Sequence, residues 1–347
     1  MHLLDAQRGD DLAGPAQSQP NPARIFDTLL YSYARAEALK AAIELDLFTA
    51  IAEGSRDPVS LAERCAAASR GIRTLCDFLV VNGFLTKTGG EYALTPDTRT
   101  FLDKHSPAYL GSVAQFMAHR HNAERSATLL ESVRKGSCVR DVVDDVDDWV
   151  TFAHAMLPLA APVAAAVAGA LNARDAGPMS VLDVAASHGE FGLAVARANP
   201  QAHIVGLDFE RVIAVGAQRA RAEGLDSRYS TIAGSAFDVD LGGPYDVVLL
   251  PNFLHHFELR KVQAFMRKVA GALKPKGRVA IVDFVPNEDR VTPPWPAMFS
   301  MTMLTATTGD AYTLREFEDV LKHAGFADLR VFPAAPSPQT IIIAHRT

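Results

Sequence analysis

The chain is poor in cysteine and has no cysteine pair at metal-binding spacing. Its 347 residues include three cysteines, Cys65, Cys76 and Cys138. An odd number without a C-x-x-C pair argues against a disulfide framework and against a zinc site. The pattern predicts reduced thiols among small apolar core side chains, and therefore a cytoplasmic protein.

Long apolar segments are also missing from the sequence. No run reaches the roughly 18 apolar residues of a membrane-spanning helix, and the N-terminus lacks the basic flank and apolar stretch of a secretory signal. The net charge of -6 does not favour a surface dominated by nucleic-acid binding. We therefore expect no membrane or nucleic-acid partner, and disorder over residues 1–21.

Residues 22–130 show a helical pattern followed by a hairpin. Apolar residues recur at three- and four-residue spacing from Leu29 onward, which predicts one long helix or a pair of helices. Asp57-Pro58 marks the start of a further helix, residues 71–84 predict another, and Thr88-Gly89-Gly90 separates two short strands. Two helices and a hairpin in this order predict a winged helix.

A winged helix can bind DNA or join two subunits. DNA binding requires basic residues on the second helix and the wing, where the sequence offers Arg73 and Lys87 alone. The first helix carries an apolar stripe that would suit a two-fold interface. The stripe includes Leu29, Tyr33, Leu39 and Ile43. We therefore predict a winged-helix dimerisation domain and a homodimer.

Residues 131–178 are predicted to form a connector with two parts. The first part is rich in aspartate, which could hold a metal ion but is more typical of a solvated linker or helix face. The second part predicts one or two helices with Trp149, Phe152 and Met156 on one side. These three side chains either pack in the core or line an acceptor pocket, and we predict the pocket.

From residue 179 onward, short apolar runs alternate with helical segments. Continuous runs of Val, Ile and Leu are typical of parallel strands that are buried on both faces. We place such strands at residues 181–184, 204–208, 229–232, 246–250 and 279–284. A helix closed by Gly325 and two further strands follow, the last of them antiparallel. The alternation predicts an α/β fold with a doubly wound, Rossmann-like sheet over residues 179–347.

Polar residues follow three of these strands at their carboxyl ends, where the ligands of parallel sheets bind. A turn ending in Gly189 follows the first strand, Asp208 ends the second, and His255 follows the fourth. The turn is not G-x-G-x-x-G, so a dinucleotide is not implied. Asp208 could accept both hydroxyl protons of a ribose, or cap a helix. The arrangement predicts a nucleotide-like ligand beside a proton-transfer residue.

These segments together resemble the class I S-adenosylmethionine-dependent small-molecule O-methyltransferases, which include plant caffeic acid enzymes, acetylserotonin enzymes and bacterial enzymes of secondary metabolism. The resemblance covers nearly the whole chain, through VLDVAASHG, LLPNFLHHF and TLREFEDVLKHAGF. It implies S-adenosylmethionine as donor, S-adenosylhomocysteine as product and no metal. By position it implies His255 as general base, Asp283 as its supporting acid and Phe237 beside the adenine.

The predicted donor site combines the first turn, the ends of neighbouring strands and the GSAF segment. Its members are Asp183, Ala185, Ser187, Gly189, Asp208, Phe209, Ser235, Ala236, Phe237 and Asn252. The predicted acceptor site is mostly apolar, and its methionines suit planar, irregular molecules, although those after Pro293 could equally be helix core. Its members are Trp149, Phe152, Met156, His256, Met298, Phe299 and Met303.

The chain departs from the family pattern at several positions. Ala185, Ala186 and Ser187 replace the glycines of the first turn, so residues with Cβ atoms must form it. Ser235 stands where the plant enzymes have an aspartate that reads the adenine amine, and Pro251 where they have a lysine. A second supporting acid is missing, and Asp310 lies one position from its expected place.

The predicted reaction is O-methylation of a hydrophobic, aromatic small molecule. A phenol has a pKa of about 10, so a positioned neutral imidazole would assist in-line methyl transfer by removing its proton. His255 fits this role, with Asp283 holding its tautomer, and His256 is the alternative base. The alternatives to this function are C- or N-methylation on the same fold, a nicotinamide oxidoreductase, and a ligand-sensing regulator.

Overall fold

A computed structural model of the protein describes residues 21–142 and 145–347. Within these residues the chain divides into two compact units, residues 21–123 and residues 124–347. The disorder expected for residues 1–21 concerns positions that, apart from Asn21, lie outside the described residues.

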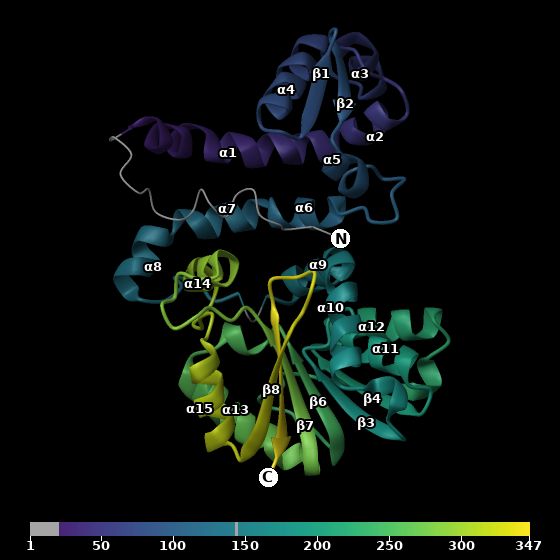
Figure 1. Cartoon of the computed structure of the whole chain (residues 1–347), viewed down its shortest axis with the longest axis vertical. Coiled ribbons are helices and arrows are strands. Elements are labelled where there is room, and N and C mark those ends of the chain that lie inside the picture. Colours follow the sequence, from purple (N-terminus) through teal and green to yellow (C-terminus); the bar gives the residue numbers. More distant parts are fainter. Residues whose placement is uncertain (1–20, 143–144) are drawn as a thin grey trace. The chain divides into compact units, whose positions relative to one another are not determined.

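The N-terminal unit contains the expected winged helix (Figure 1). Its elements are α1 (Ala23–Glu44), α2 (Leu47–Ala52), α3 (Pro58–Arg64), α4 (Ser69–Val81), β1 (Leu85–Thr88), β2 (Glu91–Leu94), α5 (Pro96–Phe101), α6 (Gly111–Met117) and α7 (Arg120–Ala127), which crosses the boundary between the units. Asp57 caps α3 by accepting hydrogen bonds from the Val59 and Ser60 amides at 2.9 and 3.1 Å.

The basic residues of the second helix and the wing are engaged within the unit. Arg73 and Lys87 both form ion pairs with Asp77, at 3.0 and 2.6 Å. The Asp77 carboxylate also accepts a hydrogen bond from the Tyr92 hydroxyl at 2.7 Å. One carboxylate thus pairs with both of the cations in the predicted helix and wing.

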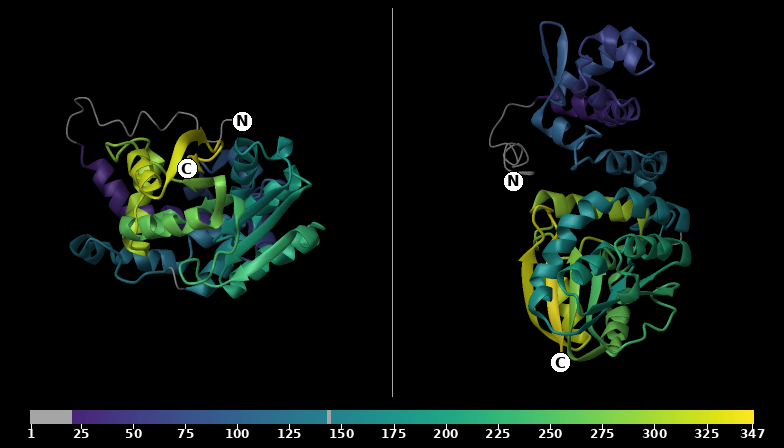
Figure 2. Two further views of the ribbon diagram at one scale, coloured as in Figure 1. Left: turned by 90° about the horizontal axis from the view of Figure 1, so that it is seen from below. Right: turned by 90° about the vertical axis from the view of Figure 1, so that its right-hand side faces the viewer.

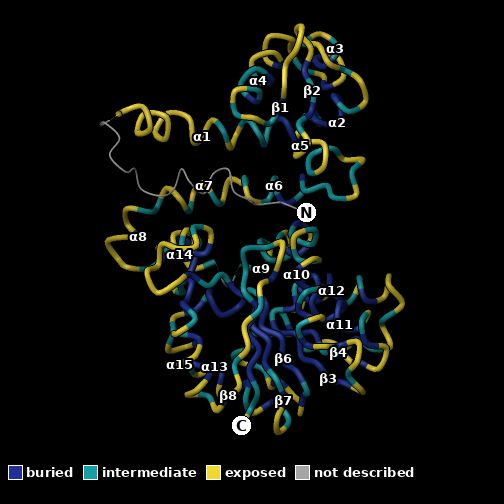
Figure 3. The backbone as a smooth tube through the Cα atoms, viewed as in Figure 1, coloured by how far each residue is buried: buried dark blue, intermediate teal, exposed yellow. Residues whose placement is uncertain are grey.

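The apolar stripe of α1 divides into a buried half and an exposed half (Figure 3). Ile43 lies in the core of its own unit with Leu47, whereas Leu29 and Tyr33 are 71% and 69% exposed. The expectation that Ile43 belongs to an exposed stripe is therefore wrong, because the winged helix itself covers the C-terminal part of α1. On α1, the exposed large apolar side chains are therefore confined to its first three turns.

The larger unit is built on a seven-stranded sheet with strand order β5-β4-β3-β6-β7-β9-β8. The strands are β3 (Met179–Val184), β4 (Ala202–Asp208), β5 (Tyr229–Ala233), β6 (Tyr245–Pro251), β7 (Leu273–Asp283), β8 (Phe326–Pro333) and β9 (Thr340–Arg346). β9 is antiparallel to both β7 and β8, while the pairs among β3 to β7 are parallel. The doubly wound sheet with an antiparallel last strand is confirmed.

Helices cover both faces of this sheet (Figure 2). They are α10 (Leu157–Ala170), α11 (Glu190–Ala198), α12 (Glu210–Ala222), α13 (Leu259–Ala272) and α15 (Leu314–His323). The described residues of this unit also form α8 (Leu129–Lys135), α9 (Val146–Ala155) and α14 (Pro294–Ala306). Val181 packs in a core with α10 and α11, and its neighbour Leu182 packs in a second core with α13 and α15. Successive side chains of a strand point to opposite faces, so a continuous apolar run serves both cores.

The aspartate-rich connector is held by caps and ion pairs. Asp145 caps α9 by accepting from the Asp148 amide at 3.3 Å, and Asp147 pairs with Arg211 at 2.6 Å. Within residues 21–142 and 145–347, no group of three or more His, Cys, Asp or Glu side chains could hold a metal ion. Asp144, one of the acids of this segment, lies outside the described residues.

Helices α9 and α10 meet at a sharp bend. Across the described part of the chain, no single helix is long and apolar enough to cross a membrane; α9 and α10 reach that length and composition as a pair, but with a 74° bend between them.

Candidate active site

The turn after β3 has a backbone conformation that glycine normally adopts. Ala185 and Ser187 have φ of 52°, and Gly189 has φ of 73°. Side chains with a Cβ disfavour this left-handed region, so the turn is strained at two positions. Glycine suits residue 189 because of this φ and because a Cβ would make tight contacts there, at 3.0 Å from the Gly216 Cα and 3.1 Å from the Tyr229 hydroxyl oxygen.

Asp208 holds this turn from the end of the neighbouring strand. Its carboxylate accepts hydrogen bonds from the Ser187 amide at 2.9 Å and from the Phe209 amide at 2.8 Å. Burial raises the pKa of Asp208 to about 6. No side chain caps the N-terminus of α12, so Asp208 lies at the strand end facing the turn and does not act as a helix cap.

Asp183 lies fully buried beneath the same turn. One carboxylate oxygen, Oδ2, accepts from the Gly192 amide at 2.9 Å, whereas Oδ1 has no hydrogen-bond partner, and nor does the buried Ser187 hydroxyl. Burial raises the pKa of Asp183 to about 8, and the charges of Asp208 and Glu190 act in the same direction. Unpartnered buried polar atoms fit a site that is completed by a polar ligand.

The GSAF segment beside this turn is held by a lysine that sequence reasoning missed. The Lys268 ammonium, on α13, donates to the carbonyl oxygens of Ala236, Phe237 and Val239 at 2.9, 2.8 and 2.6 Å. An ammonium has three donors, and here all three are used. Lys261 lies over the Phe237 ring at 4.3 Å from its centroid. α13 therefore fixes the segment proposed to border the adenine.

The predicted base and its acid are joined across neighbouring strands. His255, in the short η3 helix (Leu254–His256) after β6, and Asp283, at the end of β7, are both buried. The distance between His255 Nδ1 and Asp283 Oδ1 is 2.7 Å. A carboxylate accepts, so the proton lies on Nδ1 and the lone pair on Nε2 is left to act as a base. The Phe284 amide also donates to Asp283, at 2.8 Å.

Asp310 does not supply a second acid to His255. Its carboxylate is 42% exposed, pairs with Arg290 at 3.3 Å and accepts from the Ala311 amide at 2.8 Å. The adjacent Gly309 packs against the backbone of η3, where a Cβ would lie 2.1 Å from the His255 carbonyl oxygen. Across residues 21–142 and 145–347, Asp283 is the sole acid in an ion pair with His255.

A continuous row of aromatic rings surrounds the two histidines. Neighbouring centroids lie 5.5, 5.3, 4.3, 4.9 and 4.3 Å apart. In order, the rings belong to Phe152, Trp149, His256, His255, Phe299 and Phe284. The structure thus brings α9 and α14 to the predicted base, and with them four of the predicted acceptor residues.

The methionines predicted for the acceptor site and Asn252 of the predicted donor site differ in burial and contacts. Met303 is buried in α14, Met298 on the same helix is 51% exposed, and Met156 ends α9. Asn252 has a left-handed φ of 54°, and its side-chain oxygen accepts from the Gln339 amide group. Gln339, in the turn between β8 and β9, is a further contact that sequence reasoning missed.

The two neighbouring histidines differ in their surroundings. Burial lowers the pKa of His256 well below its ordinary value, and the nearby His255 lowers it further. A base with a low pKa removes protons poorly near neutral pH. Its burial therefore disfavours His256 as the alternative base.

Known proteins resemble the chain in both units. An O-methyltransferase domain model matches residues 161–327, and an O-methyltransferase dimerisation domain model matches residues 28–104. A solved structure assigned as an O-methyltransferase, from Nostoc punctiforme, is 43% identical, covers 95% of this chain and 100% of its own, and superposes with a TM-score of 0.90.

Two named relatives come from Streptomyces species. The 3-hydroxy-5-methyl-1-naphthoate 3-O-methyltransferase of Streptomyces sahachiroi is 27% identical over 92% of this chain and 94% of its own. The tetracenomycin polyketide synthesis 8-O-methyltransferase of Streptomyces glaucescens is 28% identical over 94% of this chain and 97% of its own.

The buried Asp183 leads to a prediction about stability and pH. Its pKa in the folded protein, about 8, lies above that of the unfolded chain, so its contribution to stability is full at low pH and is lost as pH rises from about 4 to about 8. Asp183→Asn cannot ionise and retains an oxygen for the Gly192 amide. Without ligand, we expect the free energy of unfolding of the variant to rise relative to that of the wild type by up to about 1.4 kcal/mol per pH unit in this range. Urea unfolding at pH 5, 6 and 7 measures this difference. If the free energies of unfolding of the two proteins changed equally with pH, the prediction would be wrong.

Proposed function

Since the chain belongs to the family of S-adenosylmethionine-dependent O-methyltransferases, we propose that it methylates a hydroxyl group of a hydrophobic, aromatic small molecule, with His255 as general base. The observation that carries the proposal is the buried His255–Asp283 pair within the row of aromatic rings. The domain organisation proposed with it has residues 22–130 pairing two subunits, residues 131–178 contributing to the acceptor pocket and residues 179–347 binding the donor.

The donor is proposed to bind at the carboxyl ends of β3, β4 and β5. S-adenosylmethionine, when bound, supplies an activated methyl group. Asp208 would accept hydrogen bonds from the ribose hydroxyls, and the unpartnered oxygens of Asp183 and Ser187 would satisfy polar groups of the same ligand. The remaining members of the proposed donor site are Ala185, Gly189, Phe209, Ser235, Ala236, Phe237 and Asn252.

His255 is proposed to accept the proton of the acceptor hydroxyl at Nε2. Asp283 keeps the proton of the imidazole on Nδ1, which leaves Nε2 unprotonated, and it stabilises the imidazolium that forms when Nε2 takes up a proton. The surrounding aromatic side chains exclude water and orient a flat acceptor so that its oxygen faces the methyl group.

The aromatic row supports a planar acceptor. Trp149 and Phe152 of α9 and Phe299 of α14 offer ring edges and faces on both sides of the histidines. The naphthoate relative, by its name, acts on a hydroxyl of a fused aromatic acid. A screen of phenolic acceptors with labelled donor, followed by NMR of the product, tests the proposal. A methyl group found on carbon or nitrogen would replace O-methylation by one of the alternative reactions.

The first prediction from the proposed donor site concerns Asp208. Asp208→Ala removes charge-assisted hydrogen bonds worth about 1.5–3 kcal/mol each, so affinity for S-adenosylhomocysteine should fall at least about tenfold. Titration calorimetry measures this. Asp226→Ala removes the same charge from an exposed position before β5 and should bind like the wild type. Unchanged affinity in Asp208→Ala would remove this residue from the donor site.

A second prediction concerns the base. His255→Ala should lower kcat about 10²–10⁴-fold without weakening S-adenosylhomocysteine binding, because the imidazole moves a proton and is not needed to hold the donor. Activity should recover at high pH and with acceptors of low pKa, which ionise unaided. Kinetics across pH with two phenols of different pKa measure both effects.

His256→Ala is the matched comparison for this experiment. We expect it to change kcat less than tenfold, since the low pKa of His256 makes it a poor base. If His256→Ala abolished turnover and His255→Ala remained active, the assignment of the base would be wrong. If neither variant lost activity, the acceptor group would not be an ionisable hydroxyl.

A homodimer through the N-terminal unit is the proposed assembly. The dimerisation domain match and the exposed Leu29 and Tyr33 of α1 support it. Leu29→Asp should convert the dimer to a monomer at micromolar concentration, measured by light scattering. Val81→Asp places the same charge at the end of α4, on another exposed apolar residue of this unit, and should remain dimeric. A monomeric wild type would contradict the proposal.

A further inference from the structure

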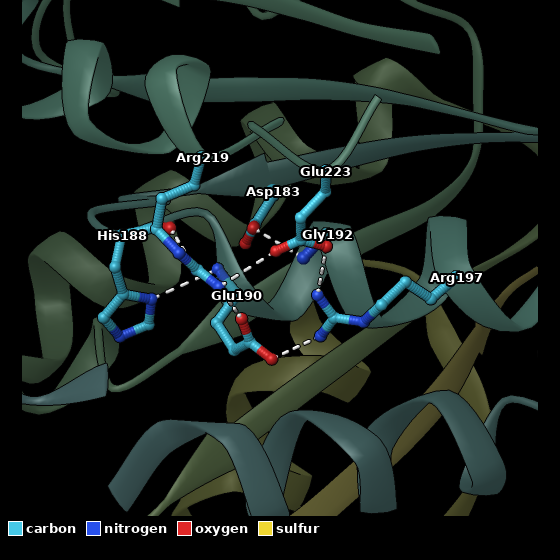
Figure 4. A network of polar contacts seen from close by, with 7 residues as sticks. All are labelled: Asp183, His188, Glu190, Gly192, Arg197, Arg219 and Glu223. Carbon is cyan, nitrogen blue, oxygen red and sulfur yellow. Dashed lines mark hydrogen bonds and ion pairs between the residues drawn. The ribbon is translucent and has the colours of Figure 1, made fainter. Parts of the chain in front are cut away.

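Four charged residues of α11 and α12 form a closed ring of ion pairs (Figure 4). Glu190 pairs with Arg197 and, at 2.6 Å, with Arg219. Glu223 pairs with the same two arginines, at 2.8 and 3.2 Å. Charges of opposite sign therefore alternate around the ring, and each residue has two partners.

The ring is buried on the side of Glu190. The Glu190 side chain is 4% exposed, whereas those of the other three members are 23% to 41% exposed. A buried carboxylate is costly unless it is paired, and removal of one partner leaves part of that cost uncompensated. Arg219 and Arg197 each pair with one oxygen of the buried Glu190 carboxylate.

Arg219 differs from Arg197 because it also contacts the turn at residues 185–189, where the methyl donor is proposed to bind. Its Nη1 donates to the carbonyl oxygen of His188 at 2.8 Å, while its Nη2 serves Glu190 and Glu223. The hydrogen bonds of Arg197 go to Glu190 and Glu223. The Arg219 guanidinium is planar, and its N–H groups are fixed relative to one another. The carboxylates of Glu190 and Glu223 therefore orient Nη1 toward the His188 carbonyl.

The turn that receives this hydrogen bond needs external support. His188 lies between Ser187, whose φ of 52° is unfavourable for a serine, and Gly189. On the other side of the same residue, the Glu190 amide donates to His188 Nδ1 at 3.1 Å. The ring thus holds His188 through its carbonyl, and the first turn of α11 holds it through its side chain.

We propose that Arg219 is a positioning residue for donor binding, which acts through the His188 carbonyl to keep residues 185–189 in their strained, binding-competent conformation. The inference rests on the proposed function, because it assumes that this turn receives the donor. In this proposal, Glu190 and Glu223 orient the Arg219 guanidinium, whereas Arg197 takes part in the ring of ion pairs alone.

The test compares Arg219→Gln with Arg197→Gln, which each remove one arginine from the ring. We expect Arg219→Gln to weaken binding of S-adenosylhomocysteine about tenfold by calorimetry and to raise the KM for the donor similarly. Its kcat at saturating donor and its KM for the acceptor should stay within about twofold of the wild type. Arg197→Gln should lower the melting temperature about as much as Arg219→Gln does. Its affinity for S-adenosylhomocysteine should stay within about threefold of that of the wild type.

A conservative variant protects the test against loss of folding. Arg219→Lys retains a cationic donor that can reach the carbonyl, so it should restore at least part of the lost affinity. Equal donor affinity in Arg219→Gln and the wild type would overturn the inference, as would equal losses in the two glutamine variants, because the ring would then act as a helix clamp alone. A wild type that does not bind S-adenosylhomocysteine would instead overturn the proposed function, and this inference with it.

Discussion

The conformation of the turn at residues 185–189 is the constraint on which the site depends. Two residues with Cβ atoms adopt a left-handed backbone there, at a cost of about 1–2 kcal/mol each. The turn therefore persists because its surroundings hold it: Asp208 binds the Ser187 amide, Arg219 binds the His188 carbonyl, and the Leu207 carbonyl accepts from the Ala186 amide. All three contacts come from β4 or α12, so the packing of this neighbouring strand and helix determines the shape of the turn.

Burial of carboxylates is the second cost that the site imposes on the fold. Asp183, Asp208 and Asp283 lie at the carboxyl ends of three strands. Burial raises the pKa values of Asp183 and Asp208, so at neutral pH part of the stability is given up to keep these groups out of water. Two continuous cores, one on each face of the sheet, compensate for that loss.

Sequence patterns predicted the elements of this fold well because buried parallel strands carry continuous apolar runs. The ends of β3, β4, β6 and β7 then followed, and with them the positions of Asp208 and His255, whereas Asp283 was expected from the family resemblance. The supporting contacts could not be predicted, because they depend on tertiary packing: Arg219 reaches a carbonyl 31 residues away, and Lys268 reaches carbonyls 29 to 32 residues away. The error at Ile43 has a similar cause, since periodicity identifies an apolar stripe but not what covers it.

The surroundings of His255 explain why a single acid can support it in the proposed role of general base. An imidazolium that forms in a dry site needs a counter-charge nearby, and Asp283 supplies one at 2.7 Å. The adjacent ring of His256 stays neutral because burial lowers its pKa, so it adds no like charge. At Gly309 the backbone packs so closely against His255 that a side chain could not be accommodated. In the proposed mechanism, the electrostatic support of proton uptake therefore falls on Asp283, which the Phe284 amide helps to hold.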